Sequence, residues 1–131
     1  MDPTTNKMMT GAAGGAPPPE IISFTGIGYH IYLGSAHIDF SWDTANADTV
    51  SISPDVGVLT ATSGITTHYL PSYGGGYAPA ISPYTKTYTL TASTDTKSVT
   101  SSISFYCTIQ CSGRLLRGKC FGGSGWQPNC Q

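Results

Sequence analysis

Apolar and polar residues alternate along much of the middle of the chain. Residues 38–43, 49–53, 88–92 and 99–105 place apolar side chains on one face and mostly Ser, Thr or Asp on the other. This period of two predicts half-buried β-strands. Turn-forming segments such as 54–57 separate the strands, and no stretch shows the period of a helix. Short strands joined by turns predict an all-β fold, an antiparallel β-sandwich.

The apolar face of the predicted strands defines a candidate core. Side chains at every second position of a strand point to the same face of its sheet. This rule predicts a core made of Phe24, Ile38, Phe40, Trp42, Val50, Ile52, Leu90, Val99, Ile103 and Phe105. Tyr88 shares a face with Leu90, so strand alternation already gives it a structural role.

Length and composition agree with one small β-domain. The chain has 131 residues, and 10% of them are charged, against about 25% in an average globular protein. Thr, Ser, Gly and Pro fill the difference, as is typical of strands and turns. The net charge of -1 gives no electrostatic reason to expect nucleic acid or an acidic membrane surface as partner. The apolar runs are also too short to span a bilayer.

Charge and cysteine content divide the chain into three parts. All seven acidic residues precede residue 96, whereas 98–131 contains Arg114, Arg117 and Lys119 together with all four cysteines. We therefore expect an extended arm over 1–19, a β-sandwich over 20–106 and a short Cys-rich tail over 107–131. The three basic residues of the tail form either a solvated cluster or a contact to phosphate or to an acidic neighbour.

The N-terminal segment has too few apolar residues to form a core of its own. It contains a Gly- and Ala-rich run over 11–16, and its three final prolines predict a polyproline spacer. The segment is either a flexible terminus or an arm ordered by a neighbouring subunit. The candidate docking residues are Pro3, Met8, Met9, Pro17, Pro18 and Pro19. No stretch near Met1 resembles a signal peptide, so we expect a protein made without one.

A long segment over 70–84 interrupts the series of predicted strands. Three glycines and three prolines predict that it has no regular structure. Long loops of this kind are often functional, and tyrosines supply rigid surface that is half apolar and half polar. The candidate recognition residues are Tyr69, Tyr73, Tyr77 and Tyr84. The alternative is a loop folded onto its own sandwich, with the tyrosines covering an open flank.

The four cysteines have the spacing C-x3-C-x8-C-x9-C. Common zinc sites use paired C-x2-C knuckles, so we predict two disulfides, with a zinc site as the alternative. On an extended strand, Cys107 and Cys111 would be too far apart to bond to each other. We therefore expect each to pair with Cys120 or Cys130 and the tail to pack against the end of the sandwich. Disulfides imply an oxidising compartment.

No residue pattern in the chain is typical of an enzyme. His30, His37 and His68 lack the spacing of metal ligands, and Gly74–Gly76 lacks the Lys-Ser or Lys-Thr of a phosphate-binding loop. Asp39 and Asp43 alternate with core residues, which places them on the solvent face. We therefore expect no catalytic activity, no cofactor and no metal ion.

Three stretches together resemble the bacterial and phage immunoglobulin-like repeat. These are residues 22–25, residues 38–57 and residues 87–92. The family has an "LSWxTxNAxxVxIxPxxG" stretch, then a "TYTLTA" strand, then a valine-rich strand. The resemblance implies an immunoglobulin-like sandwich, with Tyr88 at the tyrosine-corner position and Trp42 as a core aromatic residue. The segment 70–84 and the Cys-rich tail depart from the family pattern.

A second resemblance concerns residues 2–15. They are similar to the "DPTTxKxxxGAAGG" stretch that opens some tailed-phage virion proteins. Together the two resemblances imply a non-enzymatic virion accessory protein, either a capsid decoration or a tail or fibre component. Its partners would be other virion proteins or copies of itself, bound through the arm. Assembly in the host cytoplasm, followed by release into an oxidising medium, would permit disulfides.

Two other functions fit the same residues. One is a secreted bacterial surface or adhesion module of immunoglobulin-like fold, which would be extracellular. The other is a small carbohydrate-binding domain that uses the tyrosine-rich loop. In each case the partner would be a host surface glycan or protein. Incorporation into particles, a cell-surface location and saturable binding of free sugar distinguish the three functions.

Overall fold

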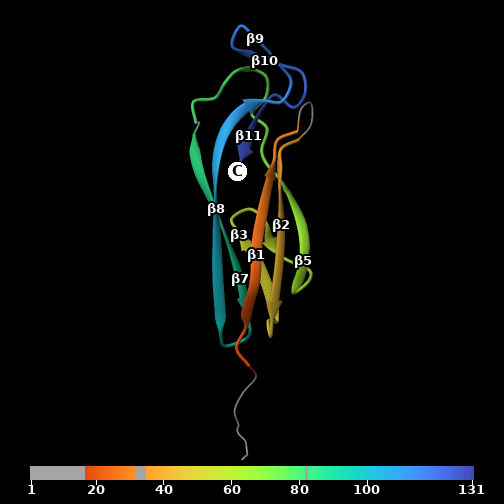
Figure 1. Ribbon diagram of the computed structural model, residues 1–131, viewed down its shortest axis with the longest axis vertical. Helices are drawn as coiled ribbons and strands as arrows, with labels where there is room; N and C mark the ends of the chain where they lie inside the picture. The colour runs from red at the N-terminus through yellow and green to blue at the C-terminus, as the bar shows by residue number, and fades with distance from the viewer. Residues whose placement is uncertain (1–16, 32–34, 82) are drawn as a thin grey trace, which may run out of the picture.

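The alternating stretches form β-strands, as their pattern predicts. The computed structural model describes residues 17–31, 35–81 and 83–131 (Figure 1). Those residues form strands, turns and loops, and none of them lies in a helix. The described part of the chain accordingly contains no helix that could cross a membrane. Of the candidate docking residues, Pro3, Met8 and Met9 lie outside the described residues.

The strands are arranged in two main sheets and one small sheet, and every strand pairing is antiparallel. The first main sheet has the order β1 (Glu20–Tyr29), β2 (His37–Ala45), β5 (Ser63–Tyr69). The second has the order β11 (Trp126–Cys130), β8 (Ser98–Cys111), β7 (Tyr84–Ser93), β3 (Thr49–Ser53), β4 (Gly57–Val58). The small sheet has the order β6 (Gly76–Tyr77), β10 (Lys119–Phe121), β9 (Arg114–Leu116).

The main core lies between the two large sheets and confirms the all-β, sandwich-like prediction. Eight of the ten predicted core residues are buried there. Val99 and Ile103 are only partly buried and pack against the edge of the core. Ile103 lines a shallow groove between β1 and β8, and Val99 lies beside the turn that joins β7 and β8. The core also contains Tyr88, Ala92, Cys107 and Cys130.

The C-terminal tail is built into the second sheet. Strand β8 continues through Cys107 to Cys111, because residues 107–111 pair with β11. The sequence places Cys107 at the end of its strand, and the structure places it inside the strand. Strands β9 and β10 extend beyond the sandwich at the end opposite to the start of β1 (Figure 1).

Both disulfides have the pairing that the spacing favours. Cys107 is bonded to Cys130, and Cys111 is bonded to Cys120. Cys107 and Cys130 are buried in the main core, whereas Cys120 belongs to a second, smaller cluster with Ile109 and Trp126. The first bond therefore ties the end of the chain to the sandwich, and the second ties the small sheet to β8.

Two glycines allow β1 to approach the second sheet closely. A Cβ atom at Gly26 would lie 2.8 Å from the Phe105 ring and 2.9 Å from Ile103. A Cβ atom at Gly28 would overlap the backbone carbonyl of Cys130. Flexible side chains can move aside, but the Cys130 backbone is fixed by its disulfide and by its pairing with Cys107. Gly28 is therefore the position where the two sheets tolerate no side chain.

Replacement of Gly28 by alanine should destabilise the whole fold. We expect a loss of about 3 kcal/mol, at the upper end of the usual cost of overpacking, because backbone must move to admit the methyl group. The gain of about 0.4–1 kcal/mol from a less flexible unfolded chain offsets only part of it. Chemical denaturation of Gly28→Ala and of the exposed neighbour Ile27→Ala measures the effect. Equal stability of the two variants would contradict this packing.

The two disulfides should differ in what they stabilise. In chain-entropy terms each contributes about 3 kcal/mol, but only the Cys107–Cys130 pair lies in the main core. We expect Cys107→Ala/Cys130→Ala to lower the melting temperature of the sandwich more than Cys111→Ala/Cys120→Ala does. In the second variant, the loss should be concentrated in residues 111–121. Thermal melts and amide exchange report these effects, and the reverse order would refute the assignment of Cys107 and Cys130 to the core.

Candidate functional site

A pocket of about 320 Å³ opens where the end of β5 faces the start of β7. We call it the tyrosine pocket. Its walls come from the β3–β4 turn, from β5, from the segment between β5 and β7, from β7 and from the end of β11. The lining residues are Asp55, His68, Leu70, Pro71, Tyr73, Ile81, Tyr84, Lys86, Tyr88 and Cys130. Its volume lies at the lower end of the range of about 300–1,000 Å³ for small-molecule sites.

The segment between β5 and β7 is held in place by the Trp126 residue of β11. The Tyr73 N–H donates to the Trp126 carbonyl at 2.8 Å, and the Trp126 N–H donates to the Gly74 carbonyl at 2.8 Å. The Trp126 indole N–H donates to the Gly76 carbonyl at 2.7 Å. Gly76 and Tyr77 form the short strand β6, which pairs with β10. The prediction that this segment has no regular structure is therefore wrong at β6.

Positively and negatively charged groups meet at the pocket. The Lys86 Nζ atom lies 3.2 Å from the Asp55 Oδ2 atom, and it lies 5.8 Å from the centre of the Tyr88 ring. The His68 ring meets the Tyr88 ring edge-on, with 5.8 Å between centres. The Tyr73 side chain lies close enough to that of Tyr84 to raise the pKa of the Tyr84 hydroxyl. The pocket thus combines aromatic surface with one balanced ion pair.

The ionisable groups of the pocket favour their neutral forms. Burial, followed by the nearby Asp55 and Tyr84, raises the pKa of Tyr88 to about 12. Burial, followed by Tyr73, also raises the pKa of Tyr84. Burial lowers the pKa of His68; Lys86 adds to this effect and Asp55 opposes it. At neutral pH, both phenols keep their protons and the imidazole is predominantly uncharged.

The buried Tyr88 does not form the hydrogen bond of a tyrosine corner. Its side chain is 1% exposed and lies in the core, as the resemblance to immunoglobulin-like domains implies. In a tyrosine corner the hydroxyl bonds to a backbone group a few residues upstream. Among residues 17–31, 35–81 and 83–131, the Tyr88 hydroxyl has no hydrogen-bond partner. The residue instead lines the tyrosine pocket.

The four tyrosines predicted as a recognition surface lie in three places. Tyr73 and Tyr84 lie together at the tyrosine pocket. Tyr77 lies in β6, with the Lys119 Nζ atom 5.0 Å from the centre of its ring. Tyr69 is 66% exposed and lies on the outer face of the first sheet, next to His37. The structure therefore brings only two of them together, and their role in recognition stays a prediction.

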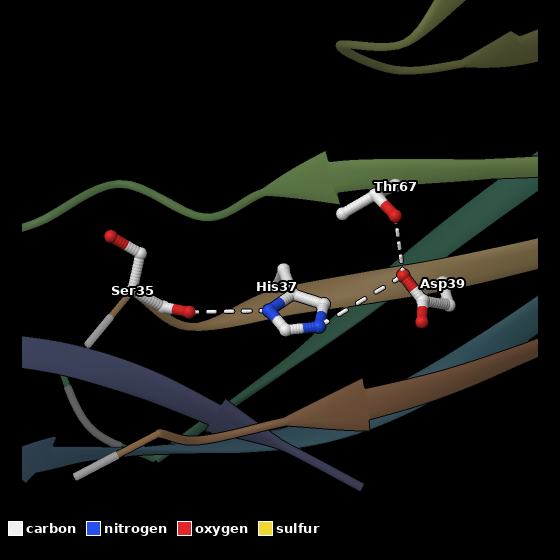
Figure 2. A network of polar contacts seen from close by, with 4 residues as sticks. All are labelled: Ser35, His37, Asp39 and Thr67. Atoms are coloured by element: carbon white, nitrogen blue, oxygen red, sulfur yellow. Dashed lines mark hydrogen bonds and ion pairs between the residues drawn. The ribbon is translucent and has the colours of Figure 1, made fainter.

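The outer face of the first sheet carries a polar network (Figure 2) and, beside it, a row of aromatic rings. The His37 ring stacks on Tyr29, with 5.0 Å between centres, and its Nδ1 atom lies 3.2 Å from the Ser35 carbonyl. Its Nε2 atom lies 3.9 Å from the Asp39 carboxylate. That carboxylate accepts a hydrogen bond of 2.7 Å from the Thr67 hydroxyl. Cross-strand pairing, which sequence does not reveal, assembles this row.

The solvent-face assignment of the two aspartates is confirmed. Asp39 and Asp43 both alternate with buried residues of β2. Asp43 accepts a hydrogen bond of 2.6 Å from the Ser63 hydroxyl, across the pairing of β2 with β5. In the described part of the chain, no group of three or more His, Cys, Asp or Glu side chains is arranged to hold a metal ion.

The sequence analysis missed Asp55, His68 and Lys86 as pocket residues. Lys86 could have been identified from the sequence, because the alternation of β7 extends from Leu90 back through Tyr88 to Lys86 and places it on the inner face. A charged residue on the inner face of a strand marks an exception to ordinary core packing. Asp55 and His68 carried no such signal, because only the fold brings the β3–β4 turn and β5 beside β7.

No family model, curated protein or solved structure matches this chain. The resemblances to immunoglobulin-like repeats and to virion proteins therefore rest on the quoted motifs alone. A functional proposal depends on those motifs together with the geometry of the described residues.

Proposed function

We propose that this protein is a non-enzymatic accessory structural protein of a tailed-phage virion, a capsid decoration or a tail or fibre component. In this proposal residues 1–19 dock onto other virion proteins or copies of this chain, and an immunoglobulin-like head faces outward. The supporting observation is that the two ends of the head, along its long axis, differ in structure. The start of β1 lies at one end, and β9 and β10 of the small sheet lie at the other (Figure 1).

The base of the proposed arm is anchored to the head. Pro19 is buried, whereas Pro17 and Pro18 are exposed. The Pro18 carbonyl accepts a hydrogen bond of 3.4 Å from the Asn46 side chain, which extends from the turn between β2 and β3. Proline also fixes the backbone φ angle. These features favour an arm whose direction of exit from the head is defined, as docking at a fixed orientation requires.

The immunoglobulin-like part of the proposal is supported by the core. Two antiparallel sheets enclose Trp42 and Tyr88, the two aromatic residues at the positions that the family motifs imply. Three features depart from that pattern. They are the missing tyrosine-corner hydrogen bond, the segment between β5 and β7, and the disulfide-bonded tail. We attribute them to specialisation of the end of the head that lies opposite the start of β1, which we call the distal end.

The non-enzymatic part is supported by the separation of candidate catalytic groups. His37 lies on the outer face of the first sheet, His68 lies in the tyrosine pocket, and His30 follows β1. Asp39 and Asp43 accept hydrogen bonds from Thr67 and Ser63, and the His37 Nε2 atom, 3.9 Å from the Asp39 carboxylate, lies beyond hydrogen-bond distance. General acid–base catalysis needs such groups within hydrogen-bond reach of one another or of a bound substrate.

A secreted bacterial surface module is the second candidate. The two disulfides favour it, because secreted proteins fold in oxidising compartments. A virion protein satisfies the same constraint if its cysteines oxidise after the host cell lyses. Location therefore separates the two candidates, and the arm offers a direct test.

Deletion of residues 2–16 should remove the protein from particles assembled from a genome that encodes it. We expect the number of copies per particle to fall by about tenfold or more, which corresponds to at least about 1.4 kcal/mol of docking free energy. The melting temperature of the truncated chain should stay close to that of the full chain, since no core residue is removed. Quantitative mass spectrometry of purified particles and thermal melts measure the two quantities.

The variant Tyr77→Ala is the control, because Tyr77 lies at the distal end and is 72% exposed. It should be incorporated at the level of the full chain. Full occupancy by the truncated protein would refute docking through the arm. Detection of the full-length protein on cell surfaces and not in particles would favour the secreted module instead.

A further inference from the structure

The tyrosine pocket contains hydrogen-bonding groups that the protein itself does not satisfy. Tyr88 is 99% buried, and neither its hydroxyl nor the His68 ring has a hydrogen-bond partner among the described residues. Among the described residues, His30 Nε2 is the buried side-chain atom that lacks a partner, so the Tyr88 hydroxyl and the half-buried His68 ring stay accessible from the pocket. Here both groups line the same cavity, so a polar ligand in that cavity would satisfy them.

The charges at the pocket favour an uncharged ligand. Lys86 and Asp55 form an ion pair of 3.2 Å, so the two formal charges cancel. An anionic ligand would meet the Asp55 carboxylate, and a cationic one would meet Lys86. The Lys86–Asp55 pair therefore offers a ligand hydrogen-bond donors and acceptors but no net charge.

The remaining walls favour a ligand with one apolar face. Leu70, Pro71 and Ile81 line the pocket together with the aromatic ring of Tyr73. Aromatic side chains present a flat apolar surface and a polar tip. A ring that carries C–H groups on its faces and hydroxyl groups around its edge matches such walls. The pocket volume of about 320 Å³ suits a compact group of this kind.

We propose that the tyrosine pocket binds a neutral pyranose ring of a glycan, with the Tyr88 hydroxyl and the His68 ring bonding to sugar hydroxyls. The inference deepens the proposed function, on which it rests for its biological setting: an outward-facing head would carry a glycan-recognition site. The raised pKa of Tyr88 agrees with this ligand class, since a protonated phenol can both donate and accept a hydrogen bond.

The pocket is preformed, which favours binding. Cys130 lines it and is held by its disulfide to Cys107. Tyr73 is held by the backbone hydrogen bond that its N–H donates to the Trp126 carbonyl. Groups that are already ordered lose little entropy when a ligand binds.

The test is a titration of the full chain with four probes, the methyl glycosides of glucose, galactose, mannose and N-acetylglucosamine. Amide chemical shifts in NMR spectra report both the affinity and the location. We expect saturable binding of at least one probe, with shifts concentrated at residues 68–73 and 84–88. The variant Tyr88→Phe keeps the buried ring and removes only the hydroxyl. Its Kd should rise about three- to tenfold, as for the loss of one hydrogen bond.

The matched control is Tyr106→Phe, which removes an exposed hydroxyl from β8, outside the tyrosine pocket. Its Kd should equal that of the unmodified chain. A thermal melt verifies that both variants fold. The inference would be overturned if none of the four neutral probes binds saturably, or if Tyr88→Phe binds as tightly as the unmodified chain. Because the titration uses the protein in solution, its failure leaves incorporation into particles, and thus the proposed function, standing.

Discussion

The position of the final strand, β11, is the constraint on which the rest of the structure depends. β11 pairs with β8 over five residue pairs and is bonded to it through Cys107 and Cys130. On its other side the Cys130 carbonyl occupies the space that a side chain at Gly28 would fill. A strand bonded to one sheet and in backbone contact with the other fixes the distance between the sheets at this end. The end of the chain therefore helps to complete the sandwich.

The same strand gives structure to segments that have little of their own. Trp126 makes three hydrogen bonds with the backbone of residues 73–76. The buried Gln127 side chain accepts a hydrogen bond from the Ala36 N–H, just before β2. A segment rich in glycine and proline gains conformational entropy when released, so it stays ordered only where such bonds offset the cost. The tyrosine pocket exists because β11 holds its wall in place.

Sequence alone predicted the parts of this fold that depend on local periodicity. Alternation identified the strands and most of the core, and the four-residue spacing excluded a bond between Cys107 and Cys111. It did not predict β6, because two residues carry no periodicity, nor the continuation of β8 through Cys107. The sequence did not predict the pocket either, because Asp55, His68 and Lys86 come together only through the packing of the sheets. Of these three residues, only Lys86 could have been identified from the sequence, because strand alternation places it on the inner face of its strand.

Native-state hydrogen exchange at the Tyr73 amide tests most directly whether β11 organises the distal end. That amide donates to the Trp126 carbonyl, so it can exchange only when the contact between the segment and β11 opens. The account predicts that the Tyr73 and Trp126 amides exchange slowly and together, with protection similar to that of the β8–β11 amides. Rapid exchange at Tyr73, at the rate of an unstructured loop while β8 and β11 remain protected, would contradict it.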